Sequence, residues 1–245
     1  MAASDEKLIS VIADLLACDA HVAVGAASPI PGAAALLAQE EAKAVGRRMQ
    51  VTILHSRTEN HFTEGARELF DCAAQGRISS FFLGGVQIDG RANINLVGLG
   101  DYPRTKKRFA GSFGSALMYF VVPKVILFRE EHSPRTLVER VDFVSAPGVS
   151  EPSVWRPGGP KALVTGRCVF AFDPGRARFR LSQVHTDENE ASVRDATGFE
   201  FDVDENLSPS VEPSEQRLAL LRQRIAPKVH SFYPEFAARI WPDHI

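Results

Sequence analysis

Apolar runs and helical stripes alternate along the first half of the chain. Apolar residues repeat at helical spacing from Ser4 onward, and the run HVAVG (21–25) that follows is typical of a buried strand. Continuous apolar strands between amphipathic helices indicate an α/β protein with a mostly parallel sheet covered on both faces. The expected strands are 21–25, 49–54, 80–85, 93–100 and 124–128, and the expected helices are about 4–16, 32–43, 63–75 and 115–120.

The pattern changes after residue 148. A loop rich in Pro, Gly and Ser precedes two amphipathic segments, ALVTGRCVFAFD (162–173) and ARFRLSQVH (177–185), which predict an antiparallel pair of strands. A helix ending at Gly198, a strand from Phe199 and a charged helix over 214–225 follow. Because no repeat or clear boundary interrupts the pattern, we expect residues 1–245 to form a single domain with an antiparallel, β-rich C-terminal part.

Composition excludes several classes of function. The chain has 245 residues, 44% hydrophobic and 24% charged, with a formal net charge of -2, which gives no reason to expect nucleic acid as a partner. The most apolar window is broken by Pro29, Pro31 and Gly32, so it cannot cross a bilayer as one helix. We expect a soluble, cytoplasmic protein with no membrane partner.

Common catalytic and metal-binding motifs are absent. The chain has no GxxxxGK[ST], GxGxxG, HExxH or GxSxG motif, and its seven histidines lack metal-ligand spacing. Its three cysteines form no CxxC pair, which favours reduced thiols packed in the core. We therefore expect no metal site.

The stretch VTILHSR (51–57) places polar groups at the end of a predicted strand. The apolar run stops at His55 and Ser56, and ligands of α/β sheets bind beyond the carboxyl ends of the strands. Ser56 is therefore a candidate site residue.

The segment GGVQIDGRANIN (84–95) is a second candidate. Two adjacent glycines after a strand allow close approach of the backbone to a ligand or a neighbouring chain. A binding loop and a turn that satisfies its own polar groups are equally compatible with the pattern. The residues concerned are Gly84, Gly85, Gln87, Asp89, Asn93 and Asn95.

A glycine-bearing turn, GSFGSAL (111–117), opens the next helix and includes Phe113 and Gly114. Exposed N–H groups at such a turn suit an oxyanion or a phosphate, although alone this is a weak signal. The basic residues just before it, among them Lys106 and Arg108, fit a solvated loop better, by about two to one, than a contact with an anionic ligand tail.

The order of these segments resembles the β subunit of two-subunit family I CoA-transferases of the glutaconate CoA-transferase type. The resemblance runs from about residue 8 to 225 and rests most on GGxQxDxxxNxN, then GSxG, then VDFxxxPG. It implies an α/β/α layered sandwich of the CoA-transferase (NagB/RpiA-like) type. It also implies an α-type partner subunit, in a heterodimer or heterotetramer, and an acyl-CoA substrate.

The resemblance also implies a catalytic glutamate after the strand VTIL, which attacks the thioester and forms a covalent glutamyl-CoA intermediate. Ser56 stands at that position here. Glu59 lies three residues further on, and a loop residue displaced that far is a poor substitute for a nucleophile that must be placed within fractions of an ångström. Ordinary CoA transfer is therefore not expected.

Two offshoots of the family lack that glutamate: a ring-opening hydrolase of CoA esters and a two-subunit 3-methylglutaconyl-CoA decarboxylase. The chain looks most like the B subunit of the decarboxylase, in which a cysteine replaces the glutamate. Whether Ser56 is a natural variant or a replacement of that cysteine stays open. The resemblance implies a cofactor-free lyase that makes 3,3-dimethylacrylyl-CoA for isovaleryl-CoA biosynthesis.

Two alternatives remain, a hydrolase of a cyclic CoA thioester and a non-catalytic partner subunit. The residues expected to act are Ser56 in catalysis, Ser28, Gly84, Gly85, Gln87, Phe113 and Gly114 in substrate binding, and Lys106 and Arg108 at the CoA phosphates.

Overall fold

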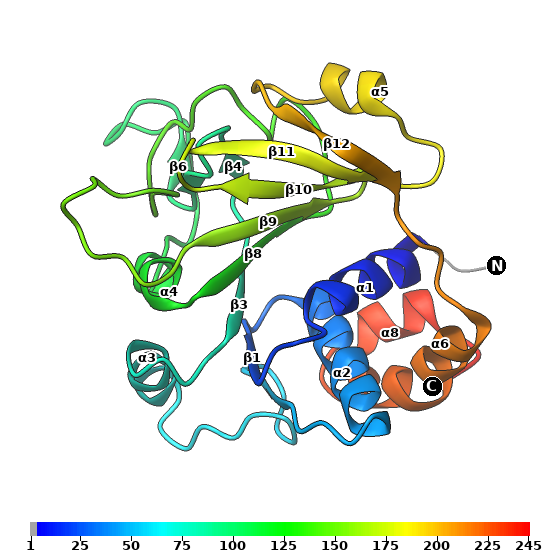
Figure 1. Cartoon of the computed structure of the whole chain (residues 1–245). Coiled ribbons are helices and arrows are strands. Elements are labelled where there is room, and N and C mark those ends of the chain that lie inside the picture. Colours follow the sequence, from blue (N-terminus) through cyan, green and yellow to red (C-terminus); the bar gives the residue numbers. More distant parts are fainter. Residues whose placement is uncertain (1–3) are drawn as a thin grey trace. The chain divides into compact units, whose positions relative to one another are not determined.

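The computed structural model describes residues 4–245, which form two compact units (Figure 1). Unit 1 contains residues up to 72 together with 77–82 and 211–245, and unit 2 contains residues 73–76 and 83–210. The single-domain organisation stays a prediction.

The strands of unit 1 are parallel. β1 (His21–Val24) pairs with β2 (Gln50–Ile53) on one side and with β3 (Ser80–Leu83) on the other. Every residue of β1 is buried, as expected for a parallel strand covered on both faces. Because parallel strands end at the same edge, the chain segments that follow β1 and β2 come together there.

Helices from both ends of the chain lie side by side in unit 1 (Figure 1). Glu6, buried in α1, accepts hydrogen bonds of 2.8 Å from Nε and Nη2 of Arg222 and one of 3.0 Å from Nε1 of Trp241. These bonds tie α1 to the C-terminal helices. The helical elements are α1 (Ser4–Leu15), α2 (Pro29–Ala44), α3 (Ala66–Ala74), α6 (Glu215–Leu220), the π-helical turn η1 (Leu221–Ile225), α7 (Ala226–His230) and α8 (Pro234–Ile240).

The larger strands of unit 2 form a mixed arrangement. β8 pairs with β9 in parallel, β9 with β10 and β10 with β11 antiparallel, and β11 with β12 in parallel. The predicted fold class, α/β with a mostly parallel sheet and an antiparallel C-terminal part, is confirmed. These elements are α4 (Ser115–Val121), β8 (Lys124–Arg129), β9 (Pro160–Thr165), β10 (Cys168–Asp173), β11 (Arg178–Val184), α5 (Glu190–Asp195) and β12 (Asp202–Pro209).

The strand expected over 93–100 does not form. Two-residue strands replace it, because the side chain of Asn95 bonds to Val97 N, Gly98 N and Gly98 O and turns the chain. Local side-chain bonds of this kind compete with a sheet ladder. The short strands are β4 (Gln87–Ile88) with β5 (Ile94–Asn95), and β6 (Gly98–Leu99) with β7 (Lys107–Arg108).

Other boundaries also differ from expectation. Segment 162–173 contains most of β9 and all of β10, since the Thr165 hydroxyl accepts bonds from Arg167 N and Cys168 N and closes a turn. The last strand begins at Asp202 rather than Phe199. Phe199 packs instead on the rings of Phe170 and Phe179. Of the three cysteines, Cys72 and Cys168 are buried, but Cys18 is exposed.

Candidate functional site

Ser56 lies in a tight turn at the carboxyl end of β2. Its N–H donates to the carbonyl oxygen of Ile53 at 3.0 Å, and its side chain is buried, with a relative exposure of 4%. The hydroxyl oxygen accepts hydrogen bonds from Thr58 N at 3.1 Å and Glu59 N at 2.9 Å, and it lies 3.2 Å from Thr58 Oγ1. Two backbone N–H groups aimed at one side-chain atom favour negative charge on that atom.

Glu59 contacts this turn through its backbone. Besides the N–H bond to Ser56, its carbonyl oxygen accepts a bond of 3.0 Å from Ile53 N, which closes the loop back onto the end of β2. The Glu59 residue is half-buried. Its main chain therefore shapes the place of Ser56, and a role for its carboxylate is not needed to explain its position.

Tyr233 contacts both Ser28 and His55, the residue before Ser56. Ser28 is the N-cap residue of α2, and its N–H donates to the Tyr233 hydroxyl at 3.4 Å. The Tyr233 ring is stacked on the imidazole of His55, with ring centroids 5.2 Å apart and planes 6° from parallel. The sequence did not indicate Tyr233, because it lies in a C-terminal segment that carries no motif.

Gly84 and Gly85 are required by their own chain. A Cβ at Gly84 would lie 2.9 Å from the carbonyl oxygen of Phe128, and one at Gly85 would lie 2.6 Å from that of Gln87. The close backbone approach predicted from the sequence is present, and the described partner is the protein's own backbone. Contact of these glycines with a substrate stays a prediction.

The polar side chains after these glycines satisfy one another. Oε1 of Gln87 accepts bonds from Asn95 Nδ2 at 2.7 Å and Asp142 N at 2.9 Å. The Asp89 carboxylate accepts bonds from Arg91 N, Asn93 N and Asn93 Nδ2, each at 3.0 Å. Of the two alternatives from the sequence, these bonds favour the self-satisfied turn.

Phe113 and Gly114 precede α4. Phe113 is 87% exposed and has a left-handed backbone conformation, with φ at 42°, which is uncommon for a residue other than glycine. Gly114 is the N-cap residue, and its carbonyl oxygen accepts from Met118 N at 3.0 Å. The turn presents an aromatic ring to the surface of unit 2.

Lys106 and Arg108 are exposed on the hairpin of β6 and β7. The Arg108 guanidinium lies 5.8 Å from the centroid of the Tyr102 ring, itself 55% exposed. This arrangement agrees with the solvated-loop interpretation, and contact with CoA phosphates stays a prediction.

The candidate residues fall into two sets. Ser28 and Ser56 belong to unit 1, where His55 and Tyr233 join them in one cluster. Those of unit 2 are Gly84, Gly85, Gln87, Lys106, Arg108, Phe113 and Gly114.

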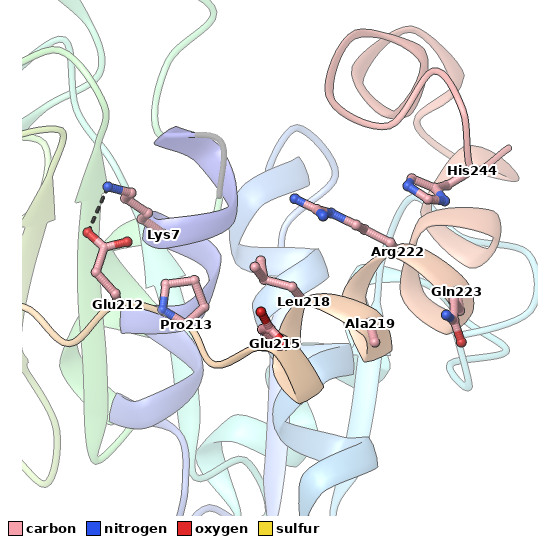
Figure 2. A pocket seen from close by; sticks show the side chains of 9 residues that line it. All are labelled: Lys7, Glu212, Pro213, Glu215, Leu218, Ala219, Arg222, Gln223 and His244. Atoms are coloured by element: carbon pink, nitrogen blue, oxygen red, sulfur yellow. Dashed lines mark ion pairs between the residues drawn. The ribbon is translucent and has the colours of Figure 1, made fainter. Parts of the chain in front are cut away.

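A pocket of about 710 Å³ lies elsewhere in unit 1 (Figure 2). It opens between α1 and the start of the C-terminal helices, beside the ion pair of Lys7 and Glu212 at 2.7 Å. None of the predicted site residues lines it, so it is separate from the cluster around Ser56. Its lining consists of Lys7, Glu212, Pro213, Glu215, Leu218, Ala219, Arg222, Gln223 and His244.

Residues 4–245 contain no group of side chains that could hold a metal ion and no helix that could cross a membrane. No three His, Cys, Asp or Glu side chains among them gather as a metal site would require. None of the helices in this part of the chain is both long enough and apolar enough for a membrane span.

Comparison with known proteins identifies the family. The family model for coenzyme A transferase matches residues 6–189. The chain is 30% identical over 153 residues to the B subunit of glutaconate CoA-transferase from Acidaminococcus fermentans, a match covering 60% of this chain and 56% of that protein. It is equally similar to the B subunit of 3-oxoadipate CoA-transferase from Pseudomonas knackmussii, with 30% identity over 153 residues and coverage of 60% and 58%.

A third relative is the cholesterol ring-cleaving hydrolase IpdB subunit of Rhodococcus jostii, 26% identical over 166 residues, with 66% of this chain and 65% of that protein covered. The matches therefore span less than two thirds of the length of each of these curated relatives.

Solved structures show the fold. IpdAB of Rhodococcus jostii matches with a TM-score of 0.81 at 21% identity, covering 98% of this chain and 99% of that one. The decarboxylase AibA/AibB matches with a TM-score of 0.76 at 20% identity and the same coverage. Glutaconate CoA-transferase of Acidaminococcus fermentans gives 0.78 at 22% identity, covering 94% and 96%. The predicted CoA-transferase fold and the resemblance to B subunits are confirmed, and this chain belongs to the coenzyme A transferase family.

Proposed function

We propose that this chain is the B-type subunit of a two-subunit, cofactor-free decarboxylase. Its substrate would be 3-methylglutaconyl-CoA and its product 3,3-dimethylacrylyl-CoA, on a route to isovaleryl-CoA in the cytoplasm. The observation that carries the proposal is Ser56, a small neutral residue where the family's transferases are expected to have a nucleophilic glutamate. Four solved variants of the decarboxylase AibA/AibB replace the same cysteine of that protein by Val, Asn, Ser or Ala.

Electrostatics favours a neutral residue at this position. The departing carboxylate of 3-methylglutaconyl-CoA is negative, and a glutamate about 4 Å away would repel it by roughly 4 kcal/mol at an effective dielectric of about 20. Ser56 removes that repulsion, and it is itself buried. A pocket poor in water favours conversion of a carboxylate into neutral CO₂.

The reaction needs stabilisation of a dienolate. Loss of CO₂ leaves an electron pair delocalised onto the thioester oxygen, and N–H donors arranged in advance around that oxygen lower the barrier. A proton donor then completes the product. The Ser56 hydroxyl is a weak acid, so we assign it hydrogen bonding to the substrate or a relay of the proton.

The partner would be an α-type subunit of the same family. The curated relatives are themselves named as subunits, and the solved relatives AibA/AibB and IpdAB are named as pairs. We propose a heterodimer or heterotetramer, in which the α-type subunit supplies part of the acyl-CoA site.

A second candidate is a hydrolase of a cyclic CoA thioester. It is favoured by the TM-score of 0.81 with IpdAB and by the similarity to the IpdB subunit. A hydrolase would add water to a ring-bearing substrate, whereas the decarboxylase would release CO₂ from an open-chain one.

Mass spectrometry of the products tests both. The chain is purified with the α-type subunit and incubated with 3-methylglutaconyl-CoA, without acetate or succinate. If the complex is a decarboxylase, the acyl group of the substrate loses the mass of CO₂. Turnover that requires a second acyl acceptor would show that the complex is a transferase. If 3-methylglutaconyl-CoA is not turned over and a ring-bearing CoA ester gains the mass of water, the hydrolase would be favoured.

A further inference from the structure

Tyr233 contacts both loops that follow the two neighbouring parallel strands of unit 1. Gly25 to Ser28 follow β1, and His55 and Ser56 follow β2. Leu54 N donates to the carbonyl oxygen of Val24 at 3.0 Å, so the two strands remain joined up to this edge. Side chains at such an edge are well placed to contact a ligand.

The hydroxyl of Tyr233 holds the first loop. It donates to the carbonyl oxygen of Ala26 at 2.7 Å, lies 3.4 Å from that of Gly25, and accepts from Ser28 N at 3.4 Å. One phenol therefore closes a turn of four residues immediately before α2. Ser28 has no side-chain bond at its own cap position, so this contact fixes the turn through the backbone.

The ring of Tyr233 holds the second loop. It lies flat against the imidazole of His55, next to Ser56 in the chain. Because His55 is exposed, this stack restricts a ring that solvent would otherwise leave free to turn. The hydroxyl and the ring of Tyr233 thus contact different loops.

Tyr233 is itself held firmly between α7 and α8. Its N–H donates to Val229 O at 2.7 Å, its carbonyl oxygen accepts from Ala237 N at 3.0 Å, and the ring of Phe232 meets it edge-on at 5.1 Å. This segment lies beyond residues 6–189, the part that matches the family model. The support for the two loops therefore comes from a part of the chain outside the matched region.

We propose that Tyr233 is a positioning residue of the candidate site, which fixes the Ser28 turn through its hydroxyl and His55 through its ring. The proposal rests on the function proposed above. Groups that contact a reacting molecule must be held within fractions of an ångström, and loops hold them less well than strands unless something packs on them.

The test compares three variants of the two-subunit complex. Tyr233→Phe removes the hydroxyl and keeps the ring, whereas Tyr233→Leu removes both. Phe236→Leu is the matched control, since Phe236 is also a half-buried aromatic residue of this segment but packs on Trp241. The measurements are kcat and KM for 3-methylglutaconyl-CoA, amide hydrogen exchange at residues 26–28, and the NMR shifts of the His55 ring protons.

We expect Tyr233→Phe to lower kcat about tenfold, with a smaller change in KM, and to speed amide exchange at residues 26–28. The His55 shifts should stay in this variant and change in Tyr233→Leu, because the ring current of the stacked phenol is then lost. Phe236→Leu should leave all three measurements unchanged. Wild-type kcat together with wild-type exchange in Tyr233→Phe would overturn the proposal.

The failure of the proposed function would look different. If the wild-type complex does not turn over 3-methylglutaconyl-CoA, that function is wrong, yet exchange and NMR still report whether Tyr233 orders the two loops. Unchanged exchange and unchanged His55 shifts in Tyr233→Leu would then overturn the positioning role as well.

Discussion

The backbone N–H of Glu59 donates a hydrogen bond of 2.9 Å to the hydroxyl oxygen of Ser56. Together with the N–H of Thr58, it gives residue 56 two donors that do not depend on any side chain. Because the hydroxyl remains protonated, these two donors fix the orientation of the Ser56 side chain and the position stays neutral.

Substitution of Ser56 by cysteine should increase activity. A neutral thiol adds no charge beside the substrate carboxylate and is a stronger acid than a hydroxyl, so it gives up the proton that completes the product more readily, and we expect Ser56→Cys to raise kcat about tenfold. Stopped assays of CO₂ release measure this. Ser56→Val, which has neither a hydroxyl nor a thiol, should reduce turnover below that of wild type, whereas Thr58→Val, which keeps both N–H donors, should change turnover little. Full activity in Ser56→Val would assign the chain a non-catalytic role.

The carboxylate of Glu59 should be dispensable. Glu59→Gln keeps the backbone bonds to Ser56 and Ile53 and removes only the charge, so kcat should stay within about twofold of wild type. Intact-protein mass spectrometry during turnover should show no CoA attached to the wild-type chain. Loss of turnover in Glu59→Gln, together with a CoA adduct on wild type, would identify Glu59 as a nucleophile and contradict the decarboxylase.

Sequence reasoning succeeded where one periodicity dominates. The fully buried run of β1 and the Ala-rich helix α2 could be read directly, because apolar spacing alone decides them. It failed at 93–100, where the side chain of Asn95 satisfies three backbone groups and replaces a strand by a turn. The hydrogen bonds of one polar side chain are not visible in a hydrophobic pattern.

The candidate site shows the same division. Ser56 could be found because it ends a predicted strand, and the structure places it in a buried turn at that end. Tyr233 could not, since 205 residues separate it from Ser28 and no motif marks it. Only the packing of the C-terminal helices beside the strand ends brings Tyr233 to the site. That packing depends on tertiary contacts such as the hydrogen bond from Trp241 to Glu6.

A buried histidine should make the protein sensitive to acid. The Nδ1 and Nε2 atoms of His132 each lie 2.8 Å from a threonine hydroxyl, those of Thr165 and Thr197. Burial, with a smaller contribution from the charge of Arg167, lowers the pKa of His132 from 6.5 to about 4. The unfolded chain therefore binds this proton first, and folding stability falls as the pH drops from about 6.5 to about 4.

The size of this effect can be measured. A shift of this size corresponds to roughly 3 kcal/mol of unfolding free energy lost across that window. Urea unfolding at several pH values should show His132→Gln to be less stable than wild type at neutral pH but with a flatter pH dependence. The exposed His230 provides the control, and His230→Gln should keep the wild-type slope. An unchanged slope in His132→Gln would mean that other groups cause the acid sensitivity.

The basic hairpin gives a prediction about CoA. If Lys106 and Arg108 contact its phosphates, their attraction acts through solvent and is screened over about 8 Å at physiological salt. The double variant Lys106→Ala/Arg108→Ala should therefore weaken CoA binding to the complex several-fold at low salt and little at high salt. Calorimetric titration at two ionic strengths measures this. The matched control, Arg140→Ala/Lys161→Ala, removes two other exposed cations of unit 2 and should leave the affinity unchanged. Equal affinities of the hairpin variant and wild type at low salt would show that Lys106 and Arg108 are solvated residues. Removing charges that contact phosphate must weaken CoA binding at low salt, where screening is weakest.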